Sequence, residues 1–351
     1  MGGRPNINIE FKKLAQSAKA RSANGIVVLI LKDDTDKSFS TIEYADAADV
    51  EASKFTAENV GFIKSTLNGG IKKVIVSRVD IAAVTPVETA INNIGNVHYN
   101  WIGLAKGTVS EQTKLVELVK AMPKVSAVVF NNTADHERIV NFANSKVKPK
   151  ESAEITGDKY VSRILGLIGG CPLTESTTLK ILDDLESVSE PADVDLAVDE
   201  GKFVLFNDEG VVRVARGVNS LQNLGENKYA DMKKITIMDT LSMIRRDIYS
   251  LFKDHYVGNY KNSYDNQVIF FVAVQDYLNQ LSVEEILDKD SSNIVNVNVE
   301  KQRAELMKLY PEAAEWTEKK IKSTTVGSNV YPITNIKVND AMEDLDFDIL
   351  N

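Results

Sequence analysis

The side chains best suited to acid–base, nucleophilic or metal chemistry are few and widely spaced. The histidines are His98, His136 and His255, and the one cysteine is Cys171. A zinc-protease helix needs the H-E-x-x-H spacing, and His136-Glu137 is not followed by a second histidine there. Cys171 lies in an apolar, glycine-rich stretch, which favours a buried thiol over a nucleophile. We therefore predict locally hydrogen-bonded histidines, an inert thiol and no metal site.

Phosphate and cofactor motifs are also missing from the sequence. Gly201-Lys202 is followed by Phe203, which does not fit a P-loop, and the glycines at 166, 169 and 170 do not fit a dinucleotide fingerprint. No G-x-S-x-G nucleophile elbow occurs. The paired acids at 33–34 and 183–184 are typical of a turn and a solvated helix face. We expect a protein that is not an enzyme and binds no cofactor.

The composition of the chain argues against nucleic acid and membrane as binding partners. The 351 residues carry a net charge of -9, with 50 acidic against 41 basic side chains, and no basic tract of nucleic-acid type. Apolar runs are strand-sized, far short of the ~20 residues that span a bilayer. A single cysteine allows no intrachain disulfide. These features predict no nucleic-acid binding, no membrane insertion and a protein made in the cytoplasm.

The elements that would have to position any site alternate between strand and helix over residues 25–144. Strands are expected at 25–31, 73–79, 99–104 and 125–130, and helices at 55–67, 86–94, 110–121 and 135–143. Ser110 is the expected N-cap of the third helix, with Thr113 at the capping-box position. Such alternation predicts βαβ units, a parallel sheet and an α/β fold class.

The remaining chain has a mixed, α+β pattern. We expect a loop at 146–158 and short strands at 194–197, 203–206 and 211–215, the last two forming a hairpin around residues 208–210. Long helices are expected at 234–254 and 265–280. A half-buried strand is expected at 295–299, followed by a charged helix at 300–323 that Pro311 breaks.

Both ends of the chain have the period of a strand. Asn6 and Asn8 alternate with Ile7 and Ile9, and near the C-terminus Leu345, Phe347 and Ile349 alternate with aspartates. A terminal strand must join its own sheet or pair with another chain. The pattern alone is compatible with folding back onto the subunit and with strand donation to a neighbour.

Five segments, in order along the whole chain, are similar to one protein family. They are residues 3–11 with 21–27, 165–173, 214–221, 247–248 and 256–262. They resemble the tail sheath proteins of phage-tail-like particles from Gram-positive bacteria, with PBSX-like prophages and diffocin-type R bacteriocins as the closest types. Asn259 departs from the pattern, where lysine is more usual.

The resemblance implies a structural subunit with many partners. It implies six-membered rings stacked helically around a tail tube, contacts with the tail tube, baseplate and tail terminator proteins, and contraction that drives the tube through a target envelope. No nucleotide hydrolysis is expected. The particle would be assembled in the bacterial host and released by lysis.

The resemblance also implies a division of the chain and roles for particular residues. It implies an N-terminal arm at 1–24, an outer α/β domain at 25–205, a sheath domain lining the tube at 206–330 and a C-terminal arm at 331–351. The expected donated strands are Asn6, Ile7, Asn8 and Ile9, and Leu345, Asp346, Phe347, Asp348 and Ile349. The expected receiving sheet includes Val295, Val297 and Val299, and the expected tube contacts are Lys319, Lys320 and Lys322.

Two alternatives come from other classes. A cytosolic enzyme with a Rossmann-like domain at 25–144 would bind a small ligand at the carboxyl ends of its strands. The other alternative is a different self-assembling shell, such as an S-layer or an injection-system sheath from another lineage.

Overall fold

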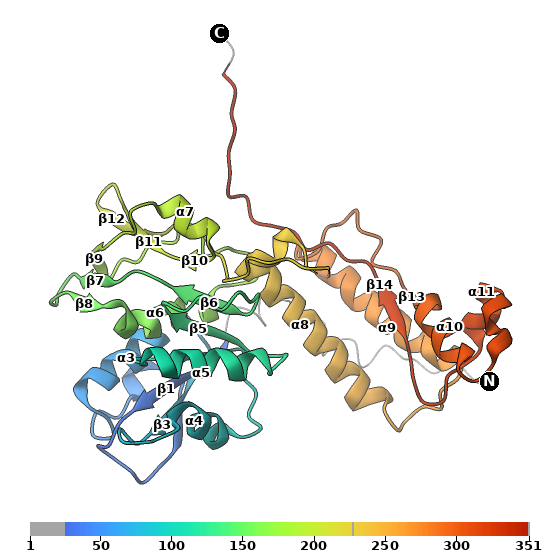
Figure 1. The fold of residues 1–351 in the computed structure, drawn as a ribbon, viewed down its shortest axis with the longest axis horizontal. Helices are drawn as coiled ribbons and strands as arrows, with labels where there is room; N and C mark the ends of the chain where they lie inside the picture. The colour runs from blue at the N-terminus through green and yellow to red at the C-terminus, as the bar shows by residue number, and fades with distance from the viewer. Residues whose placement is uncertain (1–24, 227, 350–351) are drawn as a thin grey trace, which may run out of the picture. The chain divides into compact units, whose positions relative to one another are not determined.

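A computed structural model describes residues 25–226 and 228–349 (Figure 1). The predicted donor residues Asn6, Ile7, Asn8 and Ile9 lie outside these described residues. The described chain forms two compact units. The first unit comprises residues 25–239 with 340–349, and the second comprises residues 240–339. The domain boundaries implied by the resemblance stay predictions.

The first unit is built on a seven-stranded sheet. Its strand order is β10-β6-β5-β4-β1-β3-β2, and all neighbours are parallel except β2 with β3. The strands are β1 (Ile26–Lys32), β2 (Thr41–Tyr44), β3 (Lys73–Val79), β4 (Trp101–Leu104), β5 (Ser126–Phe130), β6 (Ile139–Phe142) and β10 (Lys202–Phe203). The predicted parallel sheet and α/β fold class are confirmed.

Helices cover both faces of this sheet, which explains why β1 is apolar from Ile26 to Leu31. Helices α3 (Ala57–Leu67) and α6 (Gly157–Gly170) share a core with Val27 and Leu29, whereas α4 (Pro86–Ile94) and α5 (Val109–Lys120) share one with Val28 and Ile30. All four of these β1 side chains are completely buried. The short 3₁₀ turns η2 (Ala47–Asp49) and η3 (Ala230–Lys233) lie in connecting segments.

Glycines allow α3 and α6 to approach closely. A Cβ on Gly166 would lie 2.1 Å from the carbonyl oxygen of Thr66, and one on Gly69 would lie 2.0 Å from the carbonyl carbon of Gly166. The Thr66 hydroxyl donates to the carbonyl of Ser162 across this contact, at 3.0 Å. Gly166 is therefore an interior position of α6 that is kept small for packing.

Two helix predictions in the first unit were wrong: one segment is a strand, and one helix has a different N-cap residue. Residues 135–143 contain strand β6, because Ile139 and Val140 are β-branched, fully buried and paired with β5. The N-cap of α5 is Thr108 rather than Ser110. Thr108 and Glu111 form a reciprocal capping box, which places the helix start earlier than expected.

Three further segments of the first unit form small antiparallel sheets and a short helix. The predicted loop at 146–158 was wrong, since β7 (Lys146–Pro149) pairs with β8 (Ile155–Thr156) and β9 (Leu185–Val188). The predicted strand at 194–197 is helix α7 (Val194–Asp199), because the Asp193 side chain caps it by accepting from the Leu196 N–H. The hairpin is confirmed as β11 (Leu205–Asp208) and β12 (Val211–Val214).

The second unit is mainly helical. The predicted helices are α8 (Ile235–Leu251), which contains the unit boundary and continues into the π-turn η4 (Phe252–Tyr256), and α9 (Tyr264–Val283). Pro311 breaks the charged helix as predicted, into α10 (Val299–Met307), η5 (Pro311–Glu315) and α11 (Glu318–Ser323). Strand β13 (Val295–Val297) pairs antiparallel with β14 (Pro332–Thr334). Among the described residues, no helix is both long and apolar enough to cross a bilayer.

Candidate functional site: an assembly interface

The C-terminal segment 345–349 presents an exposed apolar row. The exposed fractions are 88% for Leu345, 72% for Phe347 and 81% for Ile349, and aspartates separate them. Figure 1 draws this segment as a plain trace, and within residues 25–226 and 228–349 it pairs with no strand. The structure therefore does not fold it back onto the subunit's own sheets. Its donation to a neighbour stays a prediction.

The root of this arm is held by a polar cluster in the first unit. The Glu343 side chain is only 4% exposed, and its Oε1 accepts hydrogen bonds from Ser176 Oγ at 2.8 Å and Thr178 Oγ1 at 2.6 Å. Its Oε2 lies 3.1 Å from Lys234 Nζ. Burial raises the pKa of Glu343, but the hydrogen bonds from Thr178, Ser176 and Lys234 outweigh it and hold the pKa below 4.5.

Two more ion pairs flank this carboxylate. Lys234 also pairs with Asp340, and Arg216 pairs with Asp344. Burial lowers the pKa of Lys234, but its hydrogen bonds to Asp340 and Glu343 raise it above 10.5 overall. Lys234 directly precedes α8. The cluster therefore fixes the start of the C-terminal arm next to the start of that helix.

The candidate receiving sheet is the β13–β14 pair of the second unit. Val295 and Val297 are 6% and 4% exposed, while Asn296 between them is exposed, so one face of β13 is buried. The pairing extends beyond the strands, since the Asn298 N–H donates to the Tyr331 carbonyl at 2.7 Å. We expected Val299 to belong to this strand, but the strand ends at Val297. Val299 is the first residue of α10, because the Asn298 side chain caps that helix.

The chain after β14 stays attached to the second unit until residue 339. Val338 forms an antiparallel bridge with Leu287, and the Asn339 N–H donates to the Ile286 carbonyl at 2.9 Å. Lys337 and Asp288 form an ion pair at 2.7 Å. The predicted C-terminal arm therefore has two parts. Residues 332–339 are hydrogen-bonded within the second unit, whereas residues 340–349 belong to the first unit.

The three lysines proposed for tube contact differ in their surroundings. Lys320 Nζ lies 3.7 Å from the ring centroid of Trp316, a cation–π contact, and Lys322 lies 3.7 Å from a carboxylate oxygen of Glu318. Lys319 is exposed on α11. All three lie on one short helix, but two of them already have partners within the subunit, which leaves Lys319 as the strongest of the three candidates.

A ligand site at the carboxyl end of the parallel sheet, which the enzyme alternative requires, is occupied by the protein's own side chains. The strand order reverses at β1, between β3 and β4. There Lys32 pairs with Glu111 at 2.8 Å, and Glu111 accepts from the Thr108 N–H at 2.7 Å. The N-terminus of α5 is thus satisfied by its own carboxylate, where a phosphate would bind in a nucleotide enzyme.

Asp33, which follows the end of β1, also forms its hydrogen bonds within the subunit. It is completely buried and accepts from the Thr56 N–H at 2.9 Å and from Asn59 Nδ2 at 2.6 Å. Burial raises its pKa, but the hydrogen bonds from Asn59, Thr56 and Thr35 lower it below 3.8 overall. Asp33 therefore ties the β1 end to the N-terminus of α3 and is not poised as a base.

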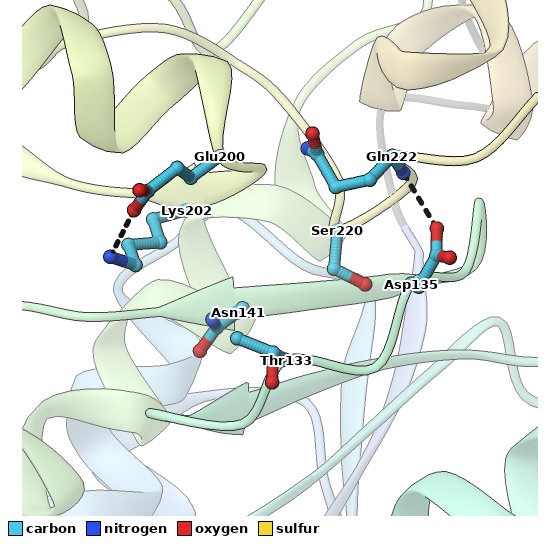
Figure 2. A pocket seen from close by; sticks show the side chains of 7 residues that line it. All are labelled: Thr133, Asp135, Asn141, Glu200, Lys202, Ser220 and Gln222. Atoms are coloured by element: carbon cyan, nitrogen blue, oxygen red, sulfur yellow. Dashed lines mark hydrogen bonds and ion pairs between the residues drawn. The ribbon is translucent and has the colours of Figure 1, made fainter.

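A polar hollow of about 360 Å³ lies beside β6 and β10 (Figure 2). It is lined by Thr133, Asp135, Asn141, Glu200, Lys202, Ser220 and Gln222. Asp135 accepts from the backbone N–H groups of Asn223 and Gln222, which lowers its pKa to about 2. Figure 2 shows Glu200 turned onto Lys202, away from Ser220. Ser220 Oγ donates to the His136 carbonyl at 3.2 Å, so the hollow pairs no nucleophile with a base.

The single-residue predictions on histidine and cysteine can be compared with the structure. His136 Nδ1 accepts from the Arg138 N–H at 3.1 Å, and burial lowers the pKa of His136 to about 4. It is a neutral, locally hydrogen-bonded histidine, as predicted. Burial raises the pKa of Cys171 to about 12, which fits an inert thiol. Among the described residues, no three histidine, cysteine or acidic side chains are grouped to hold a metal.

Comparison with known proteins identifies the family. The phage tail sheath C-terminal domain matches residues 227–349. A tail sheath protein of Clostridium phage phiCD119 is 35% identical over 357 aligned positions, which cover 98% of this chain and 98% of that protein. The chain belongs to the tail sheath protein family, a class of structural subunits. The resemblance found in the sequence is confirmed, while the narrower PBSX-like and diffocin-type assignments stay predictions.

Solved structures share the fold at low identity. A sheath tail protein from Listeria innocua has a TM-score of 0.70 at 15% identity, covering 93% of this chain and 98% of that one. One from Desulfitobacterium hafniense has a TM-score of 0.68 at 15% identity, covering 79% and 90%. The anti-feeding prophage helical sheath in its contracted state has a TM-score of 0.66 at 12% identity, covering 100% and 99%. These structures confirm the mixed α/β fold.

Proposed function

We propose that this chain polymerises into a contractile sheath around a tail tube and that contraction drives the tube through a target cell envelope. Family membership supports the sheath role. The contractile role is supported by the shared fold with the anti-feeding prophage sheath, which is described as helical and contracted. Subunits would form six-membered rings stacked helically, with tail tube, baseplate and tail terminator proteins as partners.

The observation that carries the assembly mechanism is the exposed apolar row at 345–349. Burying each large apolar side chain gains about 1.5–3 kcal/mol, and Leu345, Phe347 and Ile349 are largely exposed in the subunit. An extended segment also carries unpaired backbone groups that another sheet can satisfy. A neighbouring subunit that accepts the segment as a strand would satisfy both needs at once.

The alternation of the arm matches that of β13. An added strand would place Leu345, Phe347 and Ile349 on the buried side with Val295 and Val297, and its aspartates on the exposed side with Asn296. A two-stranded sheet is marginal by itself, and each further strand stabilises it. We infer that the sheet of one subunit receives the C-terminal strand, and also residues Asn6–Ile9, from its neighbours.

Tube contact would use weak ion pairs on α11. Lys319 is the first candidate because it is exposed, with Lys320 and Lys322 beside it on the same helix. Solvated pairs are each worth about 0.2–1 kcal/mol, so they can break and reform as the sheath moves. Residues 25–205 would form the outer part of the sheath, and residues 206–330 would form the part that lines the tube.

No reaction is needed in this account. The energy for contraction would be stored in the extended lattice and released as rigid subunits rotate and bury new surface, with interfaces of roughly 1,200 Å² or more. The polar groups at the ends of the parallel strands are committed to internal contacts, which supports a subunit without nucleotide hydrolysis. The particle would assemble in the host cytoplasm and leave by lysis.

Negative-stain microscopy of the purified chain tests the proposal. We expect rings or tubes that form as the concentration rises, and a chain shortened after residue 344 should stay monomeric with an unchanged circular dichroism spectrum. A full-length chain that remains a small particle at high concentration would contradict the sheath role. Tubes formed by the shortened chain would contradict donation of the C-terminal strand alone.

A further inference from the structure

Glu343 is a buried acid within an otherwise exposed arm. Its neighbours Met342 and Asp344 are exposed, whereas the Glu343 side chain is 4% exposed and turned into the first unit. Two hydroxyl donors and two cations surround its carboxylate: Ser176 and Thr178 donate to Oε1, and Lys234 Nζ at 3.1 Å and Arg216 Nε at 3.8 Å form ion pairs with Oε2.

The hydroxyls that receive this carboxylate are held by the backbone of the first unit. The Thr178 N–H donates to Ser176 Oγ at 3.1 Å, and the Gly217 N–H donates to Thr178 Oγ1 at 2.9 Å. Each hydroxyl oxygen accepts from the backbone, and Ser176 Oγ also lies 2.9 Å from Thr178 Oγ1, so the two hydroxyls are held together beside the carboxylate. The backbone of residues 176–178 and 217 therefore orients both hydroxyls for an acidic side chain at this position.

We call the contacts of Asp340, Glu343 and Asp344 with the first unit the latch. The latch contributes little to the apolar core of that unit. The two apolar core clusters of the first unit contain no residue from 340–349 in the described chain. What the contacts of Asp340, Glu343 and Asp344 do fix is the place and direction in which the chain leaves the unit toward Leu345. The structural product of the latch is thus the orientation of the segment that follows it.

We propose that Glu343 is the positioning residue for strand exchange, holding the root of the C-terminal arm so that residues 345–349 are presented to a neighbouring subunit. This inference rests on the proposed donation of that strand. A segment that is free along its whole length loses conformational entropy when it binds. Fixing residues 340–344 in the free subunit reduces this loss, so the latch raises the affinity of the donated strand without contacting the neighbour.

The test compares the polymerisation threshold of full-length variants by sedimentation, with microscopy of the pellets. Glu343→Gln keeps the side-chain size and removes the charge that Lys234 and Arg216 bind. We expect the subunit concentration needed for tubes to rise by about tenfold or more. Glu209→Gln removes the same charge from an exposed position on the β11–β12 hairpin and should leave the threshold unchanged.

Two further variants separate orientation from general stability. Tyr160→Phe removes a hydroxyl that donates to Asp184 at 2.8 Å in the same unit and does not touch the arm. If it raises the threshold as much as Glu343→Gln at matched loss of melting temperature, the latch only stabilises the fold and the proposal is wrong. If Glu343→Gln fails to fold, Ser176→Ala removes one donor and should still raise the threshold.

The chain shortened after residue 344 separates this proposal from the proposed function. If that chain fails to polymerise while Glu343→Gln polymerises at the wild-type threshold, strand donation stands and the latch is overturned. If the shortened chain forms normal tubes, strand donation fails, and the role of Glu343 fails with it. Loss of assembly in both, with the two controls intact, supports the latch.

Discussion

The two units of the subunit contain sheets of opposite character. In the first unit, β1 lies between β4 and β3 inside a seven-stranded sheet, with helices on both faces and the side chains of residues 27–31 buried. In the second unit, the sheet described consists of β13 and β14 alone, three residues each, and Ile333 on β14 is 47% exposed. The first sheet has helices on both faces, whereas the second is a two-stranded sheet that further strands would stabilise.

This difference suggests separate roles: the first unit as a rigid body, and the second sheet with the C-terminal arm as the connection between subunits. The inner strands of the first sheet are hydrogen-bonded on both sides and packed on both faces. Such a sheet can move as a rigid body, because its inner strands have no free edge for exchange. A short sheet with a buried face and an available partner strand can join subunits without rearranging that core. We expect mutations in the first unit to change stability and mutations in the arm or the second sheet to change assembly.

The largest expected effect is in the packing of the first unit. Gly166→Ala places a methyl group 2.1 Å from the Thr66 carbonyl oxygen, where backbone must move. We expect the free energy of unfolding to fall by about 3 kcal/mol. Gly61→Ala in α3 meets nothing within 4 Å and should stabilise the helix by about 0.5–1 kcal/mol. Thermal unfolding of both monomers measures this, and equal melting temperatures would contradict the close helix contact.

The next effect should be confined to assembly. Phe347→Ser removes an exposed ring, so monomer stability should change by less than about 0.5 kcal/mol. The association free energy should weaken by about 2 kcal/mol, because the ring is buried only in the neighbour. Val84→Ser is the matched control, since Val84 is 95% exposed in the first unit. Sedimentation of both variants decides the matter, and equal polymer yields would argue against the donated strand.

A smaller effect should depend on pH through the latch. The pKa of Glu343 is lowered, so its contribution is fully present above pH 4.5 and is lost as the pH falls through the lowered pKa. The pKa of Lys234 is raised, so its charge persists up to and beyond pH 10.5. Asp340, Asp344 and Arg216 face the same cluster.

The measurement is the ratio of polymerisation thresholds of Glu343→Gln and wild type across this range. The ratio should be constant near neutral pH and approach one in acid, since wild type then loses the charge that the variant lacks. Taking a ratio cancels the titration of the other aspartates on the arm. A ratio that does not change between pH 7 and the acid limit would show that the Glu343 charge has no part in assembly.

The smallest effect should concern the tube. Lys319→Gln should weaken co-sedimentation with the tail tube protein by about twofold to fivefold at low salt, as expected for one solvated ion pair. The difference should vanish at about 0.5 M salt because of screening. Lys308→Gln is the control, since Lys308 is also exposed on the second unit and pairs with Glu305 at 2.8 Å. Equal losses for both would argue against a specific contact on α11.

Sequence patterns predicted the centre of the fold well and its margins poorly. Strand 73–79 and helix 86–94 were predicted residue for residue, because apolar runs and Pro86 at the helix start are strong local signals. Residues 139–142 were taken as helix because a segment following a strand usually is one in α/β proteins. Their pairing with β5 is a long-range contact that the local pattern does not contain.

The candidate site shows the same limit. The alternation at Leu345, Phe347 and Ile349 is local, so the exposed row could be anticipated. Glu343 could not be, because its partners Ser176, Thr178 and Lys234 lie more than a hundred residues away in the sequence. A single acid adjoining a row of aspartates carries no sign that it is buried. Only the folded chain distinguishes it from Asp344 beside it.

The position of the latch along the chain has a mechanical consequence. Glu343 lies between the exposed segment 345–349 and strand β14, which ends at Thr334. If a neighbour pulled on the exposed segment, tension would reach Glu343 and Lys234 first and pass into the first unit there. Residues 332–339 would stay unloaded while the latch held. The latch would thus shield the register of β13 with β14 from the pull of one subunit on the next.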